Sequence, residues 1–322
     1  MINGVLNIYK EAGFSSHDVV SKLRGMVKQK RIGHTGTLDP AAEGVLPVCL
    51  GNATKVCELL TDWDKTYEAV LLLGQTTDTQ DTTGITLTEC PVEVSEARVQ
   101  QAVLSFLGTY EQVPPMYSAL KVGGKKLYEL AREGKVVERK SRPVQIYRLE
   151  ILKMELPRVW LRVSCSKGTY IRTLCHDIGE DLGCGGCMEK LLRTRVGMFS
   201  LGESLRLSQL QELKEQGRLM ERLVSVDELF PLLRRVVLKE QGDRLLYNGN
   251  PFLEEHIREW QADQHRSFSF AEIADWGKKQ ETWRGDGEDQ QVLVYDSGEN
   301  FVGIYRFVPQ EGRYRPVKMF LG

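Results

Sequence analysis

One short segment, residues 33–48, concentrates residue types that could carry out chemistry. Its sequence is GHTGTLDPAAEGVLPV. Asp39 precedes a proline, which biases it away from helical backbone angles, so we expect its carboxylate on an extended or turn segment. The three glycines permit conformations and close approaches that other residues resist. The pattern is typical of an acid presented to a substrate, although an Asx turn, in which Asp39 bonds only its own backbone, would explain the same residues.

A cluster of positive charge precedes this segment. The chain has 43 Lys and Arg against 44 Asp and Glu, a net charge of −1 that does not indicate a nucleic-acid-binding protein. Residues 22–31, however, contain five basic side chains and no acid. Such a local basic face can attract phosphates even on a neutral protein, and an ordinary solvated helix surface explains it equally well.

The elements that position these residues follow from capping and periodicity. Ser15 and Asp18 resemble a capping box, and apolar residues then recur at helical spacing up to Val27. Residues 67–73 alternate as a strand with Tyr67 on its apolar face, and the polar segment 74–84 is expected to be a loop.

The middle of the chain gives several further elements. We expect helices over 95–107 and 170–182, the first ended by Gly108 and the second by Gly183. Residues 144–156 and 159–165 are expected to form a strand pair, and 191–196 a further strand.

The character of the sequence changes near residue 235. Residues 236–246 are expected to be helical, and 292–295 with 301–307 to form a β-hairpin. Between them, residues 254–291 hold ten acids against five Lys or Arg, which argues against direct RNA contact by that part. We therefore predict two domains, 1–235 and a small β-rich domain over 236–322.

Bulk properties set further expectations. The apolar runs are too short to span a bilayer and the N-terminus has no leader pattern, so we expect a cytoplasmic protein without a membrane partner. The seven cysteines show no disulfide framework. Cys184 and Cys187 form a single CxxC pair, and because structural zinc usually requires a second pair, we favour plain thiols over a metal site.

Segments spread over residues 3–200 resemble the TruB family of tRNA pseudouridine synthases. The similarity is densest from Arg31 to Lys55, and it continues through DKTY at 64–67, PPMYSALKVGGKKLY at 114–128 and SKGTYIRTL at 166–174. The resemblance implies an α+β catalytic domain with a mixed, largely antiparallel central sheet and flanking helices. The C-terminal part is weakly similar to the PUA-type domain that follows many TruB catalytic domains.

The resemblance also implies roles for particular residues. Asp39 would be the essential catalytic residue, Tyr67 an active-site tyrosine that stacks on the base, and Arg172 the arginine that holds Asp39 ionised. His34 would insert into the tRNA T-loop, and Leu191 would line the base pocket. Further substrate contacts are expected from the following residues: Lys10, Lys22, Arg24, Arg31, Gly36 and Thr37.

The implied activity is conversion of the T-loop uridine, position 55 in tRNA numbering, to pseudouridine. The expected partner is tRNA through its T-arm, with no guide RNA, and the expected enzyme is a monomer that needs no metal and no organic cofactor. Attack of Asp39 on C1′ and abstraction of the C2′ proton both suit a single carboxylate and stay open. A tRNA-folding protein without turnover, a guide-RNA-dependent relative and a zinc-dependent RNA module are the alternatives.

Overall fold

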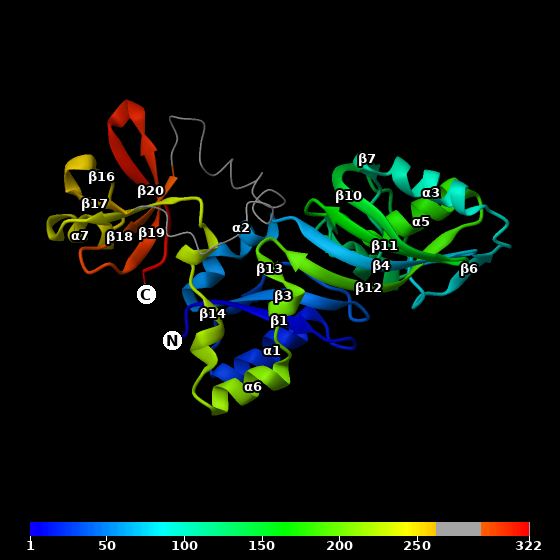
Figure 1. The fold of residues 1–322 in the computed structure, drawn as a ribbon, viewed down its shortest axis with the longest axis horizontal. Coiled ribbons are helices and arrows are strands. Elements are labelled where there is room, and N and C mark those ends of the chain that lie inside the picture. The colour runs from blue at the N-terminus through cyan, green and yellow to red at the C-terminus, as the bar shows by residue number, and fades with distance from the viewer. Residues whose placement is uncertain (262–290, 322) are drawn as a thin grey trace.

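The computed structural model describes residues 1–261 and 291–321, which form two large β-sheets and two small hairpins, with helices packed on the sheets (Figure 1). The larger sheet has ten strands in the order β14-β1-β3-β12-β4-β11-β10-β7, with β13 beside β12 and β2 beside β3. Its described pairings are antiparallel except that of β12 with β3. The α+β class and the largely antiparallel sheet are therefore confirmed.

The strands of the larger sheet are distributed over the first 224 residues. Their bounds are as follows: β1 (Gly4–Lys10), β2 (Ile32–His34), β3 (Glu43–Leu50), β4 (Lys65–Leu73), β7 (Gly108–Gln112), β10 (Arg142–Glu155), β11 (Arg158–Cys165), β12 (Gly186–Val196), β13 (Phe199–Ser200) and β14 (Leu223–Val224). The helices are α1 (Ser16–Val27), α2 (Cys57–Thr61), α3 (Glu96–Ser105), α4 (Leu127–Arg132), α5 (Ile171–Leu182), α6 (Leu207–Glu215) and α7 (Glu240–Tyr247).

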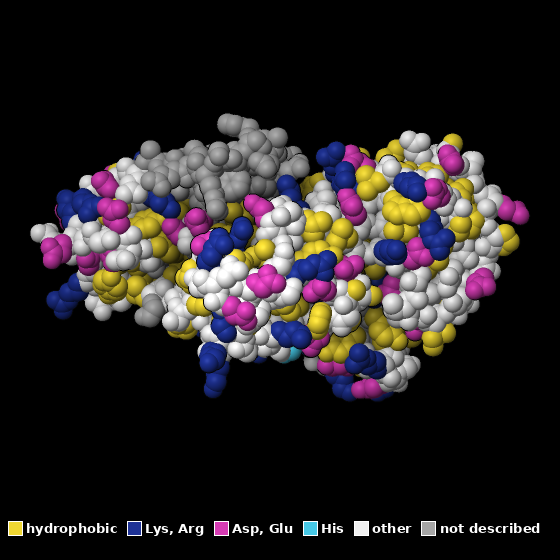
Figure 2. Space-filling model, turned by 60° about the horizontal axis from the view of Figure 1, so that its bottom comes forward, with side chains coloured by type: hydrophobic (Ala, Val, Ile, Leu, Met, Phe, Trp, Pro, Cys, Tyr) yellow, Lys and Arg dark blue, Asp and Glu magenta, His cyan; other side chains and the backbone are white. Residues whose placement is uncertain are grey.

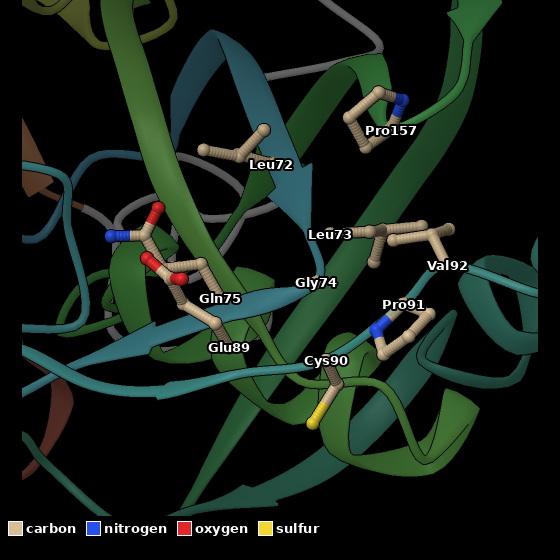
Figure 3. A pocket seen from close by; sticks show the side chains of 9 residues that line it. All are labelled: Leu72, Leu73, Gly74, Gln75, Glu89, Cys90, Pro91, Val92 and Pro157. Atoms are coloured by element: carbon tan, nitrogen blue, oxygen red, sulfur yellow. The ribbon is translucent and has the colours of Figure 1, made fainter.

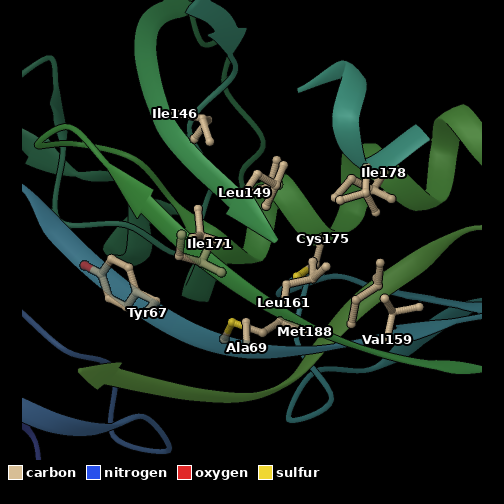
Figure 4. Packing of buried hydrophobic residues seen from close by; sticks show 14 of the residues in the cluster. Tyr67, Ala69, Ile146, Leu149, Val159, Leu161, Ile171, Cys175, Ile178 and Met188 are labelled. Atoms are coloured by element: carbon tan, nitrogen blue, oxygen red, sulfur yellow. The ribbon is translucent and has the colours of Figure 1, made fainter. Parts of the chain in front are cut away.

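The side of the sheet that faces α3 and α5 carries the largest apolar core. Alternate residues of β4, from Tyr67 to Leu73, are buried there as the period of two predicts. Val99 of α3 and Ile178 of α5 enter the same cluster. Figure 4 shows Tyr67 at the margin of this cluster with its hydroxyl directed away from the apolar side chains, so the core fixes the ring and leaves the oxygen at its edge.

Helix α1 begins as its capping signal predicts. The Ser15 hydroxyl accepts the backbone N–H of Asp18 at 3.1 Å, and the Asp18 carboxylate accepts the N–H of Ser15 at 2.8 Å. The apolar stripe packs on β1 and β3 with Leu210 of α6, while the basic residues face outward. Figure 2 shows basic and acidic side chains interspersed on the face drawn, in agreement with the near-zero net charge.

The segment after β4 is more ordered than its polar sequence indicates. The expected loop over 74–84 contains β5 (Gln75–Thr77), which pairs with β6 (Thr86–Glu89). The prediction of a plain loop is wrong here because Thr76 and Thr88 join the two strands by a hydroxyl–hydroxyl bond, a pairing that apolar periodicity cannot reveal. A second small hairpin joins β8 (Lys121–Val122) and β9 (Lys125–Lys126).

The C-terminal sheet has six strands in the order β16-β20-β19-β18-β15-β17. These are β15 (Arg234–Leu238), β16 (Phe252–Leu253), β17 (Ile257–Gln261), β18 (Gln291–Tyr295), β19 (Phe301–Val308) and β20 (Arg313–Met319). The β18–β19 hairpin is confirmed. The helix expected over 236–246 is wrong in its first part, because β15 pairs with both β17 and β18 and its Val236 and Val237 are buried in two different apolar clusters. The acidic segment falls largely outside the described residues.

The two sheets share an apolar cluster that contains Val45 of β3 and Ile304 of β19. Asn52 donates to the carbonyls of Phe320 and Leu321, both at 3.0 Å, and thereby ties the C-terminal strand end to the turn η1 (Gly51–Val56). Because the core is shared, the division at residues 235 and 236 stays a prediction. Within the described ranges, no helix has the length and apolar character needed to cross a membrane.

Candidate active site

Asp39 lies on a loop that three elements fix from different sides. The Ser16 hydroxyl at the start of α1 accepts the N–H of Leu38 at 2.9 Å. Lys10 at the end of β1 donates its ammonium to the Pro40 carbonyl at 3.2 Å. The Asp39 carbonyl accepts the N–H of Ala42 at 3.1 Å, which makes the turn that the sequence indicated. The Asp39 carboxylate remains 40% exposed, so the turn does not consume it.

Arg172, at the start of α5, reaches the carboxylate of Asp39. Its Nε lies 3.1 Å from Asp39 Oδ2, and the guanidinium side chain is only 7% exposed. The two η nitrogens donate to the carbonyls of Thr79 at 3.2 Å and Tyr117 at 2.9 Å. The helix begins where it does because Gln112 pairs with both the N–H and the C=O of Tyr170, at 2.7 and 3.0 Å. The contact predicted between Arg172 and Asp39 is therefore present, although as a single Nε contact and not as a bidentate pair.

A second carboxylate, which the sequence analysis missed, faces the same guanidinium. Asp81 Oδ2 lies 3.5 Å from Arg172 Nη1. Its other oxygen accepts the Thr79 hydroxyl at 2.9 Å and the Thr83 N–H at 3.0 Å, which anchors it within the 78–84 loop. In the sequence, Asp81 stands with Asp78 among threonines, a pattern that resembles ordinary turn chemistry.

The surroundings of Asp39 raise its pKa, which is opposite to the shift expected from Arg172 alone. Burial raises the pKa of Asp39, the Arg172 guanidinium lowers it, and the charge of Asp81 raises it further, with a net increase above the usual value. The sequence-based expectation was a pKa held low by Arg172. Arg172 does act to lower this pKa, but the loss of water around Asp39 and the charge of Asp81 outweigh it, so the net shift is upward.

Tyr67 and Leu191 lie on neighbouring strands. Tyr67 on β4 is buried, and Leu191 on β12 is half-buried and pairs with Ala69. Burial raises the pKa of Tyr67, while the Arg193 guanidinium lowers it. Tyr67 is therefore nearly closed to solvent, with its hydroxyl at the margin of the core.

Arg193, on β12, was not anticipated. Its side chain is fully buried, and its Nε donates to the Val45 carbonyl at 2.7 Å. Its η nitrogens contact the carbonyls of Thr37 at 3.5 Å and Gly36 at 3.3 Å. An arginine in the strand sequence LLRTRV gave no sign of burial, because arginine is almost never fully buried unless paired.

Asp39 opens into a cavity of about 480 Å³. Asp81 and Leu191 line it beside Asp39, and Trp160 and Leu152 form part of its apolar wall. The cavity thus combines a partly exposed carboxylate, a second acid and an apolar surface, an arrangement suited to a planar polar group. Tyr67 is not among the residues that line it.

His34, Gly36 and Thr37 form the approach to Asp39. The Nδ1 of His34 accepts the N–H of Gly36 at 3.3 Å, which leaves Nε2 as the second ring nitrogen of this half-buried side chain. Burial lowers the pKa of His34, and the nearby charge of Arg193 lowers it further. His34 is therefore favoured in its neutral form.

The expected basic contacts divide into two groups. Lys22, Arg24 and Arg31 are exposed. Arg31 also donates to the Thr54 hydroxyl at 2.8 Å, so part of its side chain is committed to η1. Lys10 is fully buried, and its ammonium donates to three backbone carbonyls, those of Glu11, Phe14 and Pro40. This placement contradicts a direct substrate contact by Lys10, because no face of the ammonium reaches the surface.

Two further features carry no evident chemistry. Cys184 and Cys187 are buried free thiols, and within residues 1–261 and 291–321 no group of three or more His, Cys, Asp or Glu stands together as a metal site. A shallower hollow of about 410 Å³ lies at the end of β4 between Leu73, Cys90 and Pro157 (Figure 3). It shares no lining residue with the Asp39 cavity.

Comparison with known proteins agrees with this geometry. Residues 24–171 match the TruB family pseudouridylate synthase N-terminal domain, and residues 172–238 match the tRNA pseudouridylate synthase B C-terminal domain. A tRNA pseudouridine synthase B from Lachnoclostridium phytofermentans is 50% identical over 99% of this chain and its own full length. One from Alkaliphilus oremlandii is 48% identical, covering 77% of this chain and 82% of that protein.

Solved structures give the same fold. A Cbf5-Nop10-Gar1 complex contains a chain that aligns with a TM-score of 0.70 and 26% identity, covering 99% of this chain and 85% of that one. A chain of an H/ACA RNP bound to a substrate RNA aligns with a TM-score of 0.69 at 24% identity, over the same shares of the two chains. With the family models and these relatives, the chain belongs to the TruB family of pseudouridylate synthases.

Proposed function

We propose that this chain converts the T-loop uridine of tRNA, position 55 in tRNA numbering, to pseudouridine, with Asp39 as the catalytic carboxylate. The observation that carries the proposal is the contact of Arg172 Nε with Asp39 Oδ2 at 3.1 Å, at the wall of a cavity to which the carboxylate is open. The name of the relative with 50% identity supports tRNA as the substrate.

The reaction breaks the N1–C1′ bond of uridine, turns the base and joins it again through C5. A base inside a helical stack cannot reach Asp39, so the uridine must be flipped out at a cost of a few kcal/mol. The apolar wall with Leu191 and Trp160 offers the released base a surface that partly offsets this cost. Tyr67 borders the site from β4, where its hydroxyl side faces out of the core.

Arg172 prepares the carboxylate for this reaction. Because Arg172 is nearly buried and held by two carbonyls, its contact fixes the direction of Asp39 before the substrate arrives. A carboxylate with a raised pKa is a stronger base or nucleophile than a solvated one once it is ionised. Attack on C1′ and removal of the C2′ proton both draw on this property.

The RNA approaches over the residues that surround the cavity. His34 in its neutral form offers an aromatic ring without a competing charge, suited to insertion between bases of the T-loop. The exposed Lys22, Arg24 and Arg31 supply phosphate contacts that position the loop without reading its sequence. The enzyme is proposed to act as a cytoplasmic monomer on the T-arm alone, without guide RNA, metal or organic cofactor.

The test is release of tritium from a T-arm stem-loop labelled at C5 of uridine. Purified protein alone should release one equivalent from the target uridine and none from a stem-loop in which cytidine replaces it. Asp39→Asn should bind the same stem-loop and release nothing. Binding without release by the unmodified chain would identify a tRNA-folding protein instead.

A further inference from the structure

Arg193 places a positive charge in the protein interior, and the fold of the family does not by itself explain why. Arg193 as a whole residue is only 1% exposed. In residues 1–261 and 291–321, its hydrogen bonds go to backbone carbonyls, the phenol of Tyr67 interacts with it electrostatically, and no carboxylate is bonded to it. Burying a cation without an opposite charge costs free energy of folding. We therefore expect the Arg193 side chain to have a role that offsets this cost.

The carbonyls that Arg193 contacts lie at both ends of the Asp39 loop. Gly36 and Thr37 stand just before Asp39, and Val45 follows the loop on β3. One guanidinium therefore joins the two ends of the loop that carries the Asp39 carboxylate. Its planar geometry suits this task, because its donors point in fixed directions.

Gly44 allows the backbone of β12 to approach closely at Arg193. Gly44 has a φ of +107°, and a Cβ placed there would lie 2.2 Å from the Arg193 carbonyl oxygen. Gly44 and Arg193 are partners in the single parallel pairing of the large sheet. The close approach that the sequence indicated at this glycine is thus made by β12 and not by a substrate.

Arg193 also lies beside β4, the strand that carries Tyr67. It is the direct partner of Tyr67 in the pairing of β12 with β4. The guanidinium and the phenol interact electrostatically, and both side chains are buried. The same group thus touches the loop of Asp39 and the hydroxyl of Tyr67.

We propose that Arg193 is a positioning residue for the isomerisation, which holds the Asp39 loop and the Tyr67 hydroxyl in one fixed relation. It reaches the reacting atoms only through these two elements. The inference rests on the proposed function, because it assigns both elements to one reaction. A misplacement of catalytic groups by 1 Å can lower a rate by about 10²-fold, which sets the size of the effect expected.

The experiment compares Arg193→Lys with the unmodified protein in three measurements. Single-turnover pseudouridine formation on a T-arm stem-loop should fall by about 10²-fold. The Kd for the same RNA should change far less, since no RNA contact is removed. Amide hydrogen exchange should accelerate within residues 36–44 and stay unchanged in α3 and α5. The matched control is Arg148→Lys, an exposed arginine on β10 paired with Glu150, which should behave as the unmodified protein does.

Arg193→Gln is the second variant, because it keeps an uncharged donor where a flexible buried ammonium could prevent folding. In a Tyr67→Phe background, the further loss of rate from Arg193→Gln should be smaller than in the unmodified background, since the interaction of the guanidinium with the phenol is already absent. Rate losses that simply multiply would overturn the link to Tyr67.

Other outcomes are equally decisive. A folded variant with near-normal turnover would overturn the proposal. So would a parallel fall of rate, RNA affinity and melting temperature in both variants, because that pattern describes a purely structural arginine. If the unmodified protein forms no pseudouridine, the proposed function fails, and the hydrogen-exchange result still decides whether Arg193 holds the loop.

Discussion

Two aspartates, one in each sheet region, have net pKa shifts of opposite direction although burial acts on both in the same way. Asp39 in the large-sheet region has a raised pKa, because burial outweighs its contact with Arg172. Asp296, after β18 in the C-terminal region, is also largely buried, and burial acts to raise its pKa. There, hydrogen bonds from Tyr247 at 2.6 Å and the Asn300 N–H at 2.8 Å outweigh burial and lower the pKa.

The difference is the one expected between the carboxylate proposed to be catalytic and a structural one. The oxygens of Asp296 are occupied by donors from α7 and from its own turn, so the charge is stabilised and unavailable. Asp39 has one guanidinium contact, a competing acid in Asp81 and an open cavity. A carboxylate with a raised pKa at the wall of a cavity is typical of functional sites, in agreement with the role proposed for Asp39.

Removing the charge at Asp39 should produce the largest effect on activity and little effect on stability. Asp39→Asn is expected to lower single-turnover pseudouridine formation by at least about 10³-fold, the scale for a group that takes part in covalent catalysis. Because the folded state raises this pKa, the ionised carboxylate is a cost to folding at neutral pH. Urea unfolding should therefore show unchanged or increased stability, and a clear decrease would place Asp39 in the same class as Asp296.

Arg172→Lys should have the next largest effect. Lysine keeps the charge, but a single ammonium cannot contact Asp39, Asp81 and the two carbonyls in the planar arrangement that arginine allows. We expect the single-turnover rate to fall by about 10²-fold, the scale of a misplaced catalytic group, with tRNA affinity retained. A rate within a few-fold of normal would show that charge alone, and not geometry, is required.

Asp81→Asn tests whether the second acid tunes the first. Loss of its charge removes one cause of the raised pKa of Asp39, so that pKa should decrease. If ionised Asp39 is the active form, the acidic limb of the pH–rate profile moves to lower pH. At neutral pH the rate should fall by roughly tenfold, about 1.4 kcal/mol of barrier, because Arg172 loses one of its anchors. An acidic limb that moves upward or stays in place would contradict this coupling.

The smallest effect on catalysis is expected from Asp296→Asn. The new amide directs its NH2 group toward the hydroxyl of Tyr247 or the N–H of Asn300, which are themselves donors. The mismatch should cost about 1–3 kcal/mol of unfolding free energy and leave turnover unchanged. Since the folded pKa of Asp296 is lowered, its contribution to stability is complete above about pH 3.9. That contribution is lost as the pH falls through the folded value, so the variant and the unmodified protein should converge in acid urea titrations. Loss of turnover at full stability would remove the contrast with Asp39.

Local signals predicted the elements they govern. The capping residues of α1, the period of β4 and the turn between β18 and β19 each depend on neighbours within a few residues, and all three are present. The start of the C-terminal sheet was misjudged, because β15 is a strand only through partners on β17 and β18. Long-range pairing of this kind leaves no local trace.

The sequence by itself determined that a carboxylate is displayed on a stiff, glycine-containing turn, because proline and glycine restrict the backbone wherever they occur. It also marked Arg172 and Tyr67 as members of the site through their resemblance to a family. Only the tertiary structure decided the electrostatics. Asp81 and Arg193 come from distant strands and loops, and Lys10 is turned inward by the carbonyls around it. Desolvation and charge pairing depend on distances in space, so the raised pKa of Asp39 could emerge only once the chain had folded.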